Sequence, residues 1–292
     1  MTELVRIDQE KCSLCGLCIP VCVRRILEEA DDTVAVTDPS RCILCGHCKA
    51  VCPEDAPELP SLDAAEFIDA PLREEVPDEE GLLSFFRSRR SIRSFQNRFV
   101  EQEKLERIIE AGRFAPTGGN RQPLHFVVLH SADVIDNIRR LTLEALLAQG
   151  NRIEEAFERS RTGGEGLPKP YQTRQLYPAI WREIAELNKQ GKDRLFFHAP
   201  ALIICHLDPG TAVTPEVDPG LAAMQMLLMA EALGLGTCLC GFLVFALEGS
   251  PQLREALRIP EDHYVPLSFM VGYPDVTFRK LVARNPSRVQ WM

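Results

Sequence analysis

Eight cysteines in two runs near the start of the chain constrain this sequence more than any other feature. The first run has C-x2-C-x2-C-x3-C spacing, and the second run repeats it thirty residues later. The members are Cys12, Cys15, Cys18 and Cys22, then Cys42, Cys45, Cys48 and Cys52. This spacing is typical of two [4Fe–4S] clusters, in which the fourth cysteine of each run ligates the other cluster. The sequence therefore predicts a chain that transfers single electrons.

The same spacing rule assigns crossed ligands to the two clusters. One cluster takes Cys12, Cys15, Cys18 and Cys52, and the other takes Cys42, Cys45, Cys48 and Cys22. Structural zinc is the main alternative, although zinc sites usually divide their ligands into two separated pairs. Disulfides do not fit the context, because no apolar signal segment opens the chain. We therefore expect a cytoplasmic protein.

The two cysteine runs belong to a small internal duplication. Residues 5–8 lead into the first run and residues 34–38 lead into the second, each as a short predicted strand followed by a cysteine loop and a helical turn. A segment of this size has little apolar core. Cluster binding is therefore expected to supply much of the free energy of its folding.

Length and charge indicate two modules with different partners. The chain has 292 residues, which suggests about two domains. Residues 1–80 hold 19 acidic and 7 basic side chains, whereas residues 81–292 hold 23 acidic and 26 basic ones. The second part is near neutral and gives no reason to expect a nucleic-acid partner. No apolar run reaches about 18 residues, so we expect no membrane span.

The boundary between the modules is predicted from proline and acidic residues, which dominate residues 53–80. We expect a two-cluster domain over residues 1–60, a linker over 61–80 and a larger domain over 81–292. The linker is expected to run over the surface of the larger domain, with Ala64, Ala65, Phe67 and Ile68 as anchors. A mobile tether is the alternative.

The larger domain opens with a predicted anion site. Its members are Arg89, Arg90, Ser91 and Arg93. Guanidinium groups bind phosphate oxygens in pairs, and the serine hydroxyl adds a donor. A basic cluster alone is more often a solvated face, so this run needs support from elsewhere in the chain.

That support comes from an irregular loop about thirty residues later. Residues 112–123 contain adjacent glycines and two prolines, and Asn120 and Gln122 offer amide groups within it. A predicted strand over residues 124–129 follows. The order Arg-Arg-Ser-x-Arg, then Ala-Pro-Thr-x-x-Asn-x-Gln-Pro, then a strand, resembles the FMN-dependent nitroreductase family.

The resemblance implies roles for these residues. Arg89, Arg90, Ser91 and Arg93 would bind the FMN phosphate and ribityl chain. Asn120 would reach the flavin ring, with Gln122 as its neighbour. Thr117 stands where the family often has serine.

The resemblance continues through the second half of the chain. It implies a strand over residues 201–205, a helix over 219–233 and a strand over 264–271. The backbone N–H groups of Cys240 and Gly241 would face N5 and O4 of the flavin, where a donor stabilises the reduced ring. Lys280 and Arg284 would return to the phosphate.

Together with the cysteine runs, the whole chain is similar to ferredoxin–nitroreductase fusions. This implies an α+β fold with a central, mostly antiparallel sheet flanked by helices, joined to a small ferredoxin-like domain at the N-terminus. The family also implies an intertwined homodimer with FMN at the subunit interface. Residues 289–292 would embrace the partner subunit.

The remaining cysteines, residues 150–195 and the histidines are not assigned to a site by the resemblance. Cys205 and Cys238 are expected to be buried hydrophobic residues, whereas Cys240 could also be a thiol that tunes the flavin. Residues 150–195 look irregular and form either a lid over the flavin or a surface excursion. The six histidines show no metal-binding spacing.

These features predict an FMN-dependent oxidoreductase that takes single electrons through two [4Fe–4S] clusters. Its acceptor is a small organic molecule, such as a nitro compound or a quinone, and its donor is an external ferredoxin or NAD(P)H. In one alternative, NAD(P)H reduces the flavin and the clusters carry electrons outward. In another, the chain is an electron-transfer subunit without a substrate of its own.

Overall fold

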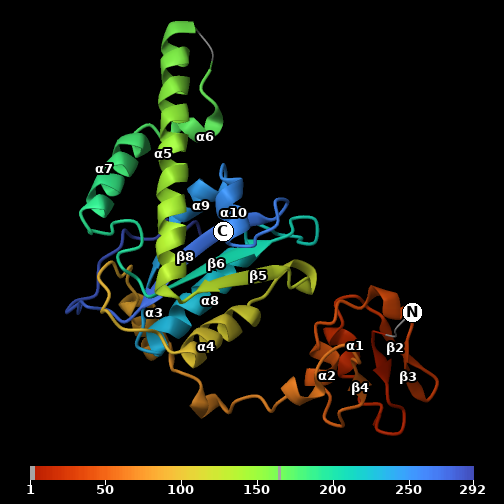
Figure 1. The fold of residues 1–292 in the computed structure, drawn as a ribbon. Helices are drawn as coiled ribbons and strands as arrows, with labels where there is room; N and C mark the ends of the chain where they lie inside the picture. The colour runs from red at the N-terminus through yellow and green to blue at the C-terminus, as the bar shows by residue number, and fades with distance from the viewer. Residues whose placement is uncertain (1–3, 164–165) are drawn as a thin grey trace. The chain divides into compact units, whose positions relative to one another are not determined.

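The chain forms two compact units in a computed structural model that describes residues 4–163 and 166–292 (Figure 1). The first unit comprises the residues up to Asp78 together with Gly119–Arg121, and the second comprises Glu79–Gly118 and the residues from Gln122 onward. The predicted boundaries of the linker, at residues 60 and 80, stay predictions.

The first unit is built from short elements around the cysteines. Two antiparallel pairs, β1 with β4 and β2 with β3, flank two helical turns. The elements are β1 Arg6–Ile7, α1 Cys18–Val21, β2 Leu27–Ala30, β3 Thr33–Val36, η1 Pro39–Arg41, α2 His47–Ala50 and β4 Pro57–Glu58. Its small core consists of Val5, Ile26, Leu27 and Val34 packed around Cys18. Such a core is too small to stabilise a domain of this size without help.

The backbone carries the duplication that the sequence predicts. Residues with left-handed φ recur thirty positions apart, as the cysteines do. The pairs are Leu14 and Leu44, Gly16 and Gly46, and Arg25 and Asp55. Because a left-handed conformation is costly for leucine, its repetition shows that both cysteine loops adopt the same strained turn.

In the segment before the second unit, the residues that we expected to act as anchors are mostly exposed. It contains two short turns, η2 Ala64–Glu66 and η3 Arg73–Glu75. Phe67 packs within the first unit, where its ring lies beneath the Lys49 ammonium and beside Gly46. Ala64, Ala65 and Ile68 are exposed. Of the four predicted anchors, Phe67 is the partly buried one, and its contacts with Lys49 and Gly46 lie in the first unit.

A four-stranded antiparallel sheet forms the centre of the second unit, with strand order β5-β6-β8-β7. The strands are β5 Leu124–Leu129, β6 Ala201–Leu207, β7 Gly236–Leu239 and β8 Tyr264–Gly272. Every residue of β6 is buried, as expected for an apolar, β-branched run covered on both faces. The strands predicted over residues 124–129, 201–205 and 264–271 are all present.

Helices cover both faces of this sheet, as the α+β fold requires. They are α3 Glu79–Ser88, α4 Gln102–Arg113, α5 Ala132–Gly163, α6 Lys169–Gln172, α7 Tyr177–Lys189, α8 Asp218–Ala232, α9 Gly241–Leu247 and α10 Pro251–Ala256, with the short turn η4 Gly118–Asn120. Leu202 and Ile204 of β6 belong to the core cluster formed with α5, α7 and α9. Ile203 belongs to the cluster formed with α4 and α8. The alternation of strand side chains therefore divides the core into two layers.

Residues 150–195 are mostly helical, which corrects the prediction of an irregular segment. Helix α5 continues through residue 163, and α7 packs against it (Figure 1). Ile153 and Ala156 lie on its buried side, while Glu and Arg occupy the rest of the turn. That is an amphipathic pattern rich in helix formers. The glycine run of residues 163–166 falls partly outside the described residues.

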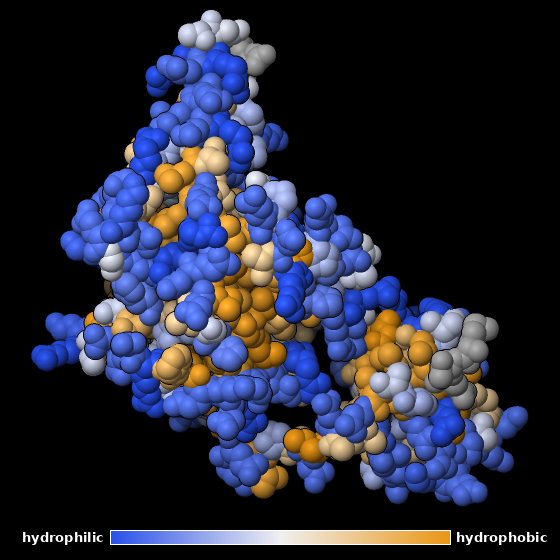
Figure 2. Space-filling view, viewed as in Figure 1, coloured by the Kyte–Doolittle hydropathy of each residue, from blue (hydrophilic) through white to orange (hydrophobic). Residues whose placement is uncertain are grey.

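Hydrophilic residues cover much of the outer half of α5, and an apolar patch lies over the middle of the same face (Figure 2). Within the described parts of the chain, none of the helices combines the length and the apolar character needed to cross a membrane.

Candidate functional site

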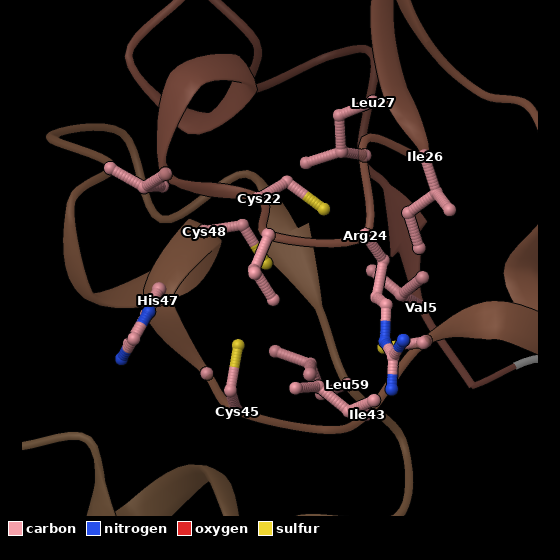
Figure 3. Close-up of a pocket in the computed structure, with 14 residues that line it drawn as sticks. Val5, Cys22, Arg24, Ile26, Leu27, Ile43, Cys45, His47, Cys48 and Leu59 are labelled. Atoms are coloured by element: carbon pink, nitrogen blue, oxygen red, sulfur yellow. The ribbon is translucent and has the colours of Figure 1, made fainter. Parts of the chain in front are cut away.

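The eight cysteines of the first unit line two separate cavities. One cavity is lined by Cys22, Cys42, Cys45 and Cys48, together with apolar residues such as Val5 and Leu59. The sulfur atoms of Cys22, Cys45 and Cys48 point into it (Figure 3). The other cavity is lined by Cys12, Cys15, Cys18 and Cys52. Each cavity therefore gathers three cysteines of one run and the fourth cysteine of the other run.

Local backbone geometry aims these cysteines at the cavities. The third cysteine of each run lies at or near the start of a helical turn, α1 or α2, just after a left-handed glycine. Two backbone N–H groups donate to sulfur: Leu44 to Cys42 Sγ and Ala56 to Cys52 Sγ, each at 3.4 Å. Donors of this kind stabilise a thiolate.

Burial holds several of these thiols in the neutral form. It raises the pKa of Cys18 and Cys42, and it raises the pKa of Cys48 to about 11. Neighbouring cysteines add to the rise in pKa: Cys12, Cys15 and Cys52 act on Cys18. Iron binds the thiolate, so loading a cluster must release protons from these groups.

The cysteines that line the cavities are not grouped as the ligands of one ion. Among the described residues, no three histidine, cysteine or acidic side chains are grouped closely enough to hold a single metal ion. This spacing disfavours the zinc alternative, because zinc needs its ligands about 2.0–2.3 Å from one centre. Four cysteines around an apolar cavity fit the corners of an iron–sulfur cluster.

In the second unit, the arginine–serine run lies beside β7. Ser91 forms a bridge with Thr237, and the Ile92 N–H donates to the Thr237 carbonyl at 2.9 Å. The Arg90 Nε is buried and has no hydrogen-bond partner among the described residues. A buried cationic donor of this kind fits an anionic ligand such as a phosphate. Arg93 is exposed.

The loop of residues 117–122 has an unusual backbone. Gly119, Asn120 and Gln122 have φ angles of 61°, 55° and 48°, in the left-handed region that non-glycine residues seldom adopt. The Thr117 hydroxyl accepts a hydrogen bond from the Gln122 N–H at 3.0 Å and closes the loop. The loop then leads directly into β5.

The structure separates the two halves of the predicted flavin site within one chain. The loop precedes β5 and the arginine–serine run lies beside β7, and these strands are opposite edges of the sheet. Three strand spacings span about 14 Å. The loop also lies level with Tyr264 of β8, whereas Ser91 lies level with Val271, seven residues or about 23 Å further along.

The structure also refines the predicted donors at the flavin ring. The Cys240 N–H donates to the carbonyl of Ser268 in β8 at 2.8 Å, so this amide is already used in a backbone hydrogen bond. Gly241 opens α9, where first-turn amides have no partner within the helix. Gly241 is therefore the better candidate of the two.

The three cysteines of the second unit are buried, and the two predicted phosphate-binding cations of the C-terminal segment are exposed. Burial raises the pKa of the Cys240 and Cys205 thiols to about 12, which favours the interpretation as buried hydrophobic residues. Cys238 is buried as well. Lys280 and Arg284 are exposed and follow β8. The segment that carries them begins beside the arginine–serine run, where the Asp275 N–H donates to the Ser94 carbonyl at 2.9 Å, and their return to the phosphate stays a prediction.

Sequence reasoning missed two polar features. Asp218, at the start of α8, is buried and binds the loop at Gly118. His125, His206 and His263 form one cluster, with ring centroids 5.0–5.4 Å apart. No spacing rule signals either feature, since their members are distant in the sequence.

Comparison with known proteins agrees with both modules. Residues 86–273 match the model of the nitroreductase family, and residues 4–53 match a 4Fe-4S dicluster domain. The predicted resemblance to a ferredoxin–nitroreductase fusion is therefore confirmed.

Individual relatives match the second module. A 4-nitrobenzoate reductase from Nocardioides sp. is 28% identical over 219 residues, which cover 68% of this chain and 83% of the relative. A nitrobenzene nitroreductase from Ectopseudomonas oleovorans is 26% identical over 210 residues, covering 68% and 89%. A nitroreductase structure with bound FMN from Desulfitobacterium hafniense DCB-2 superposes with a TM-score of 0.52 at 23% identity, covering 71% of this chain and 97% of that one. The predicted fold is thereby confirmed.

Proposed function

This chain belongs to the nitroreductase family, and on that premise we propose that it reduces a small organic acceptor in two-electron steps with electrons received singly through two [4Fe–4S] clusters. An FMN-dependent oxidoreductase joined to a dicluster domain agrees with both family matches. The observation that carries the proposal is the pair of cavities, each lined by four cysteines, in the same chain as the nitroreductase module.

Bound FMN supplies the chemistry of exchange between single electrons and electron pairs. The chain's own residues hold and orient it. Arg89, Arg90 and Ser91 bind the phosphate, and the closed loop presents Asn120 and Gln122 to the ring. The Gly241 amide donates at the ring edge. Of these groups, the buried Arg90 Nε gives the strongest support, because it is a donor without a partner among the described residues and a phosphate oxygen would accept its hydrogen bond.

We place the flavin between two copies of the chain. The loop and the arginine–serine run lie at opposite edges and opposite ends of the sheet, so one chain cannot bring both to one cofactor. A homodimer supplies the loop from one copy and the run from the other. Exposed apolar side chains after β8, namely Phe278, Leu281, Val282, Val289 and Trp291, give a second copy something to cover.

The relatives' names favour a nitro compound among the candidate acceptors. The two relatives reported above are named for the reduction of 4-nitrobenzoate and nitrobenzene. We infer that the helices over residues 150–195 cover the acceptor pocket. Tyr177 and Trp181 pack against Phe242 of α9, the helix that Gly241 opens.

The test is anaerobic absorbance of protein loaded with clusters and FMN. NADH, NADPH and a reduced ferredoxin are added in turn, and bleaching of the flavin band is followed. We expect the reduced ferredoxin to bleach the flavin and a nitro compound to restore it over repeated turnovers. If only NAD(P)H bleaches the flavin, the clusters carry electrons outward from the flavin. If the flavin is bleached but no acceptor is turned over, the chain is an electron-transfer subunit.

A further inference from the structure

Asp218 is a buried carboxylate at the start of α8, with only 1% of its surface exposed. Its Oδ1 atom accepts hydrogen bonds from the Thr214 hydroxyl and from the Gly118 N–H, the latter at 3.1 Å. Its Oδ2 atom has no hydrogen-bond partner among the described residues. Burying a carboxylate with an unsatisfied oxygen costs free energy. A residue kept at such a cost has a task that a small apolar side chain would not perform.

The contact at Gly118 is close as well as polar. A Cβ atom added to Gly118 would lie 2.7 Å from Thr214 Oγ1 and 2.8 Å from Val213 Cβ. Glycine is therefore required here for the loop backbone to approach residues 213–218. The hydrogen bond to Asp218 and this close approach fix the same point of the loop.

The loop needs such an anchor because its conformation is strained. Asn120 and Gln122 both have left-handed φ angles, which cost free energy and persist only when surrounding contacts impose them. The Thr117–Gln122 hydrogen bond closes the loop internally. That bond does not tie the loop to α8, whereas the Asp218–Gly118 bond does.

We propose that Asp218 is a positioning residue that holds loop 117–122 in the conformation in which Asn120 and Gln122 bind FMN. The inference rests on the proposed function, since it assumes that this loop contacts the flavin. Asp218 acts through Gly118 and not on the cofactor itself. Its loss frees the loop to relax to ordinary backbone angles, and the two amides then leave their places.

The test measures FMN binding to flavin-free protein by quenching of FMN fluorescence. Loss of a charged hydrogen bond predicts that Asp218→Ala raises the Kd of FMN about 10- to 100-fold. Asp218→Asn keeps an Oδ1 acceptor and should recover most of the affinity. Asp63→Ala is the matched control. Asp63 makes the same kind of bond, from the Ala65 N–H at 2.9 Å, in turn η2 of the first unit, so its removal should leave the Kd within about twofold.

A second measurement separates positioning from folding. The visible circular dichroism of bound FMN should change in Asp218→Ala at saturating FMN, while the far-ultraviolet spectrum matches wild type. A folded Asp218→Ala protein with wild-type affinity and visible spectrum would overturn the inference. If that variant does not fold, Gly118→Ala perturbs the same contact from the loop side, and wild-type FMN affinity there would overturn it. Wild-type protein that binds no FMN would instead refute the proposed function.

Discussion

At the scale of single residues, the crossed arrangement of the cysteines is the most informative feature. Cys22 belongs to the first run in the sequence but lines the cavity of Cys42, Cys45 and Cys48. Cys52 makes the reciprocal exchange. The two cysteine loops can therefore fold only together, because each cavity needs a ligand from both.

The crossed arrangement predicts which cysteine variants share a defect. Cys22→Ser should perturb the same cluster as Cys45→Ser, whereas Cys18→Ser should perturb the other cluster. The measurement is the electron paramagnetic resonance spectrum of each reduced variant, with iron content determined in parallel. Cys205→Ala, in the sheet of the second unit, is the control and should keep both signals. A Cys22→Ser spectrum that matches Cys18→Ser would contradict the assignment.

The histidine cluster is a second residue-scale feature. His125 and His206 are cross-strand partners on β5 and β6, and His206 Nδ1 lies 2.8 Å from His263 Nδ1. Burial, together with the neighbouring His125, His263 and Arg254, lowers the pKa of His206 to about 4. The folded protein therefore keeps this imidazole neutral at pH values where the unfolded chain protonates it.

This pKa predicts loss of stability in mild acid. The unfolded pKa is about 6.5, so the stabilisation is complete above that pH and is lost as the pH falls from 6.5 towards 4. The loss is at most about 3 kcal/mol. Urea unfolding followed by tryptophan fluorescence reports on the second unit, which holds Trp181 and Trp291. His206→Gln should flatten this pH dependence, and His130→Gln, at an exposed position, should not. An equal slope in both variants would contradict the account.

At the scale of elements, helices and strands could be predicted where their apolar residues follow the pattern of a buried face. The strand β6 and the helix α8 were expected from the family resemblance, and each has a face or faces of apolar residues that must leave water. Helix α5 was not predicted, and its end falls in residues 150–195, where arginine, glycine and proline suggested an irregular segment. The segment is helical because glutamate favours helices and because Ile153 and Ala156 are buried along one side of it.

Packing of β6 predicts a large cost for a cavity at its centre. Ile203 is fully buried between the sheet and helices α4 and α8. Ile203→Ala should lower the free energy of unfolding by about 2–5 kcal/mol, measured by urea denaturation of the flavin-free protein. Leu176→Ala is the matched control, because its side chain is 75% exposed and its loss should cost less than about 0.5 kcal/mol. Similar losses in the two variants would contradict the two-layer core.

Contacts between distant segments set the limit of sequence reasoning for the site. The cysteine ligands could be predicted because spacing alone carries the information. Asp218 could not, because only the fold brings it to Gly118, a hundred residues away. The engagement of the Cys240 amide with Ser268 likewise depends on the β7–β8 register, which no local pattern reveals.

At the scale of the whole molecule, the site that we propose is shared between two chains. A dimer that combines Arg90→Ala in one chain with Asn120→Ala in the other tests this directly. If each site takes Arg90 from one chain and Asn120 from its partner, one site of the mixed dimer carries both changes and the other carries none. The mixed dimer should therefore bind one FMN with wild-type affinity. Two differently tagged chains allow its purification, and binding weakened at both sites would contradict a shared site.

The central claim is that the clusters are the entrance for electrons that reach the flavin. Its most direct test is anaerobic stopped-flow absorbance of flavin bleaching by a reduced ferredoxin, in wild-type protein and in a Cys15→Ser, Cys45→Ser double variant that retains FMN. The account predicts fast bleaching in the wild type and its near-complete loss in the variant. Bleaching at the wild-type rate without intact clusters would contradict it.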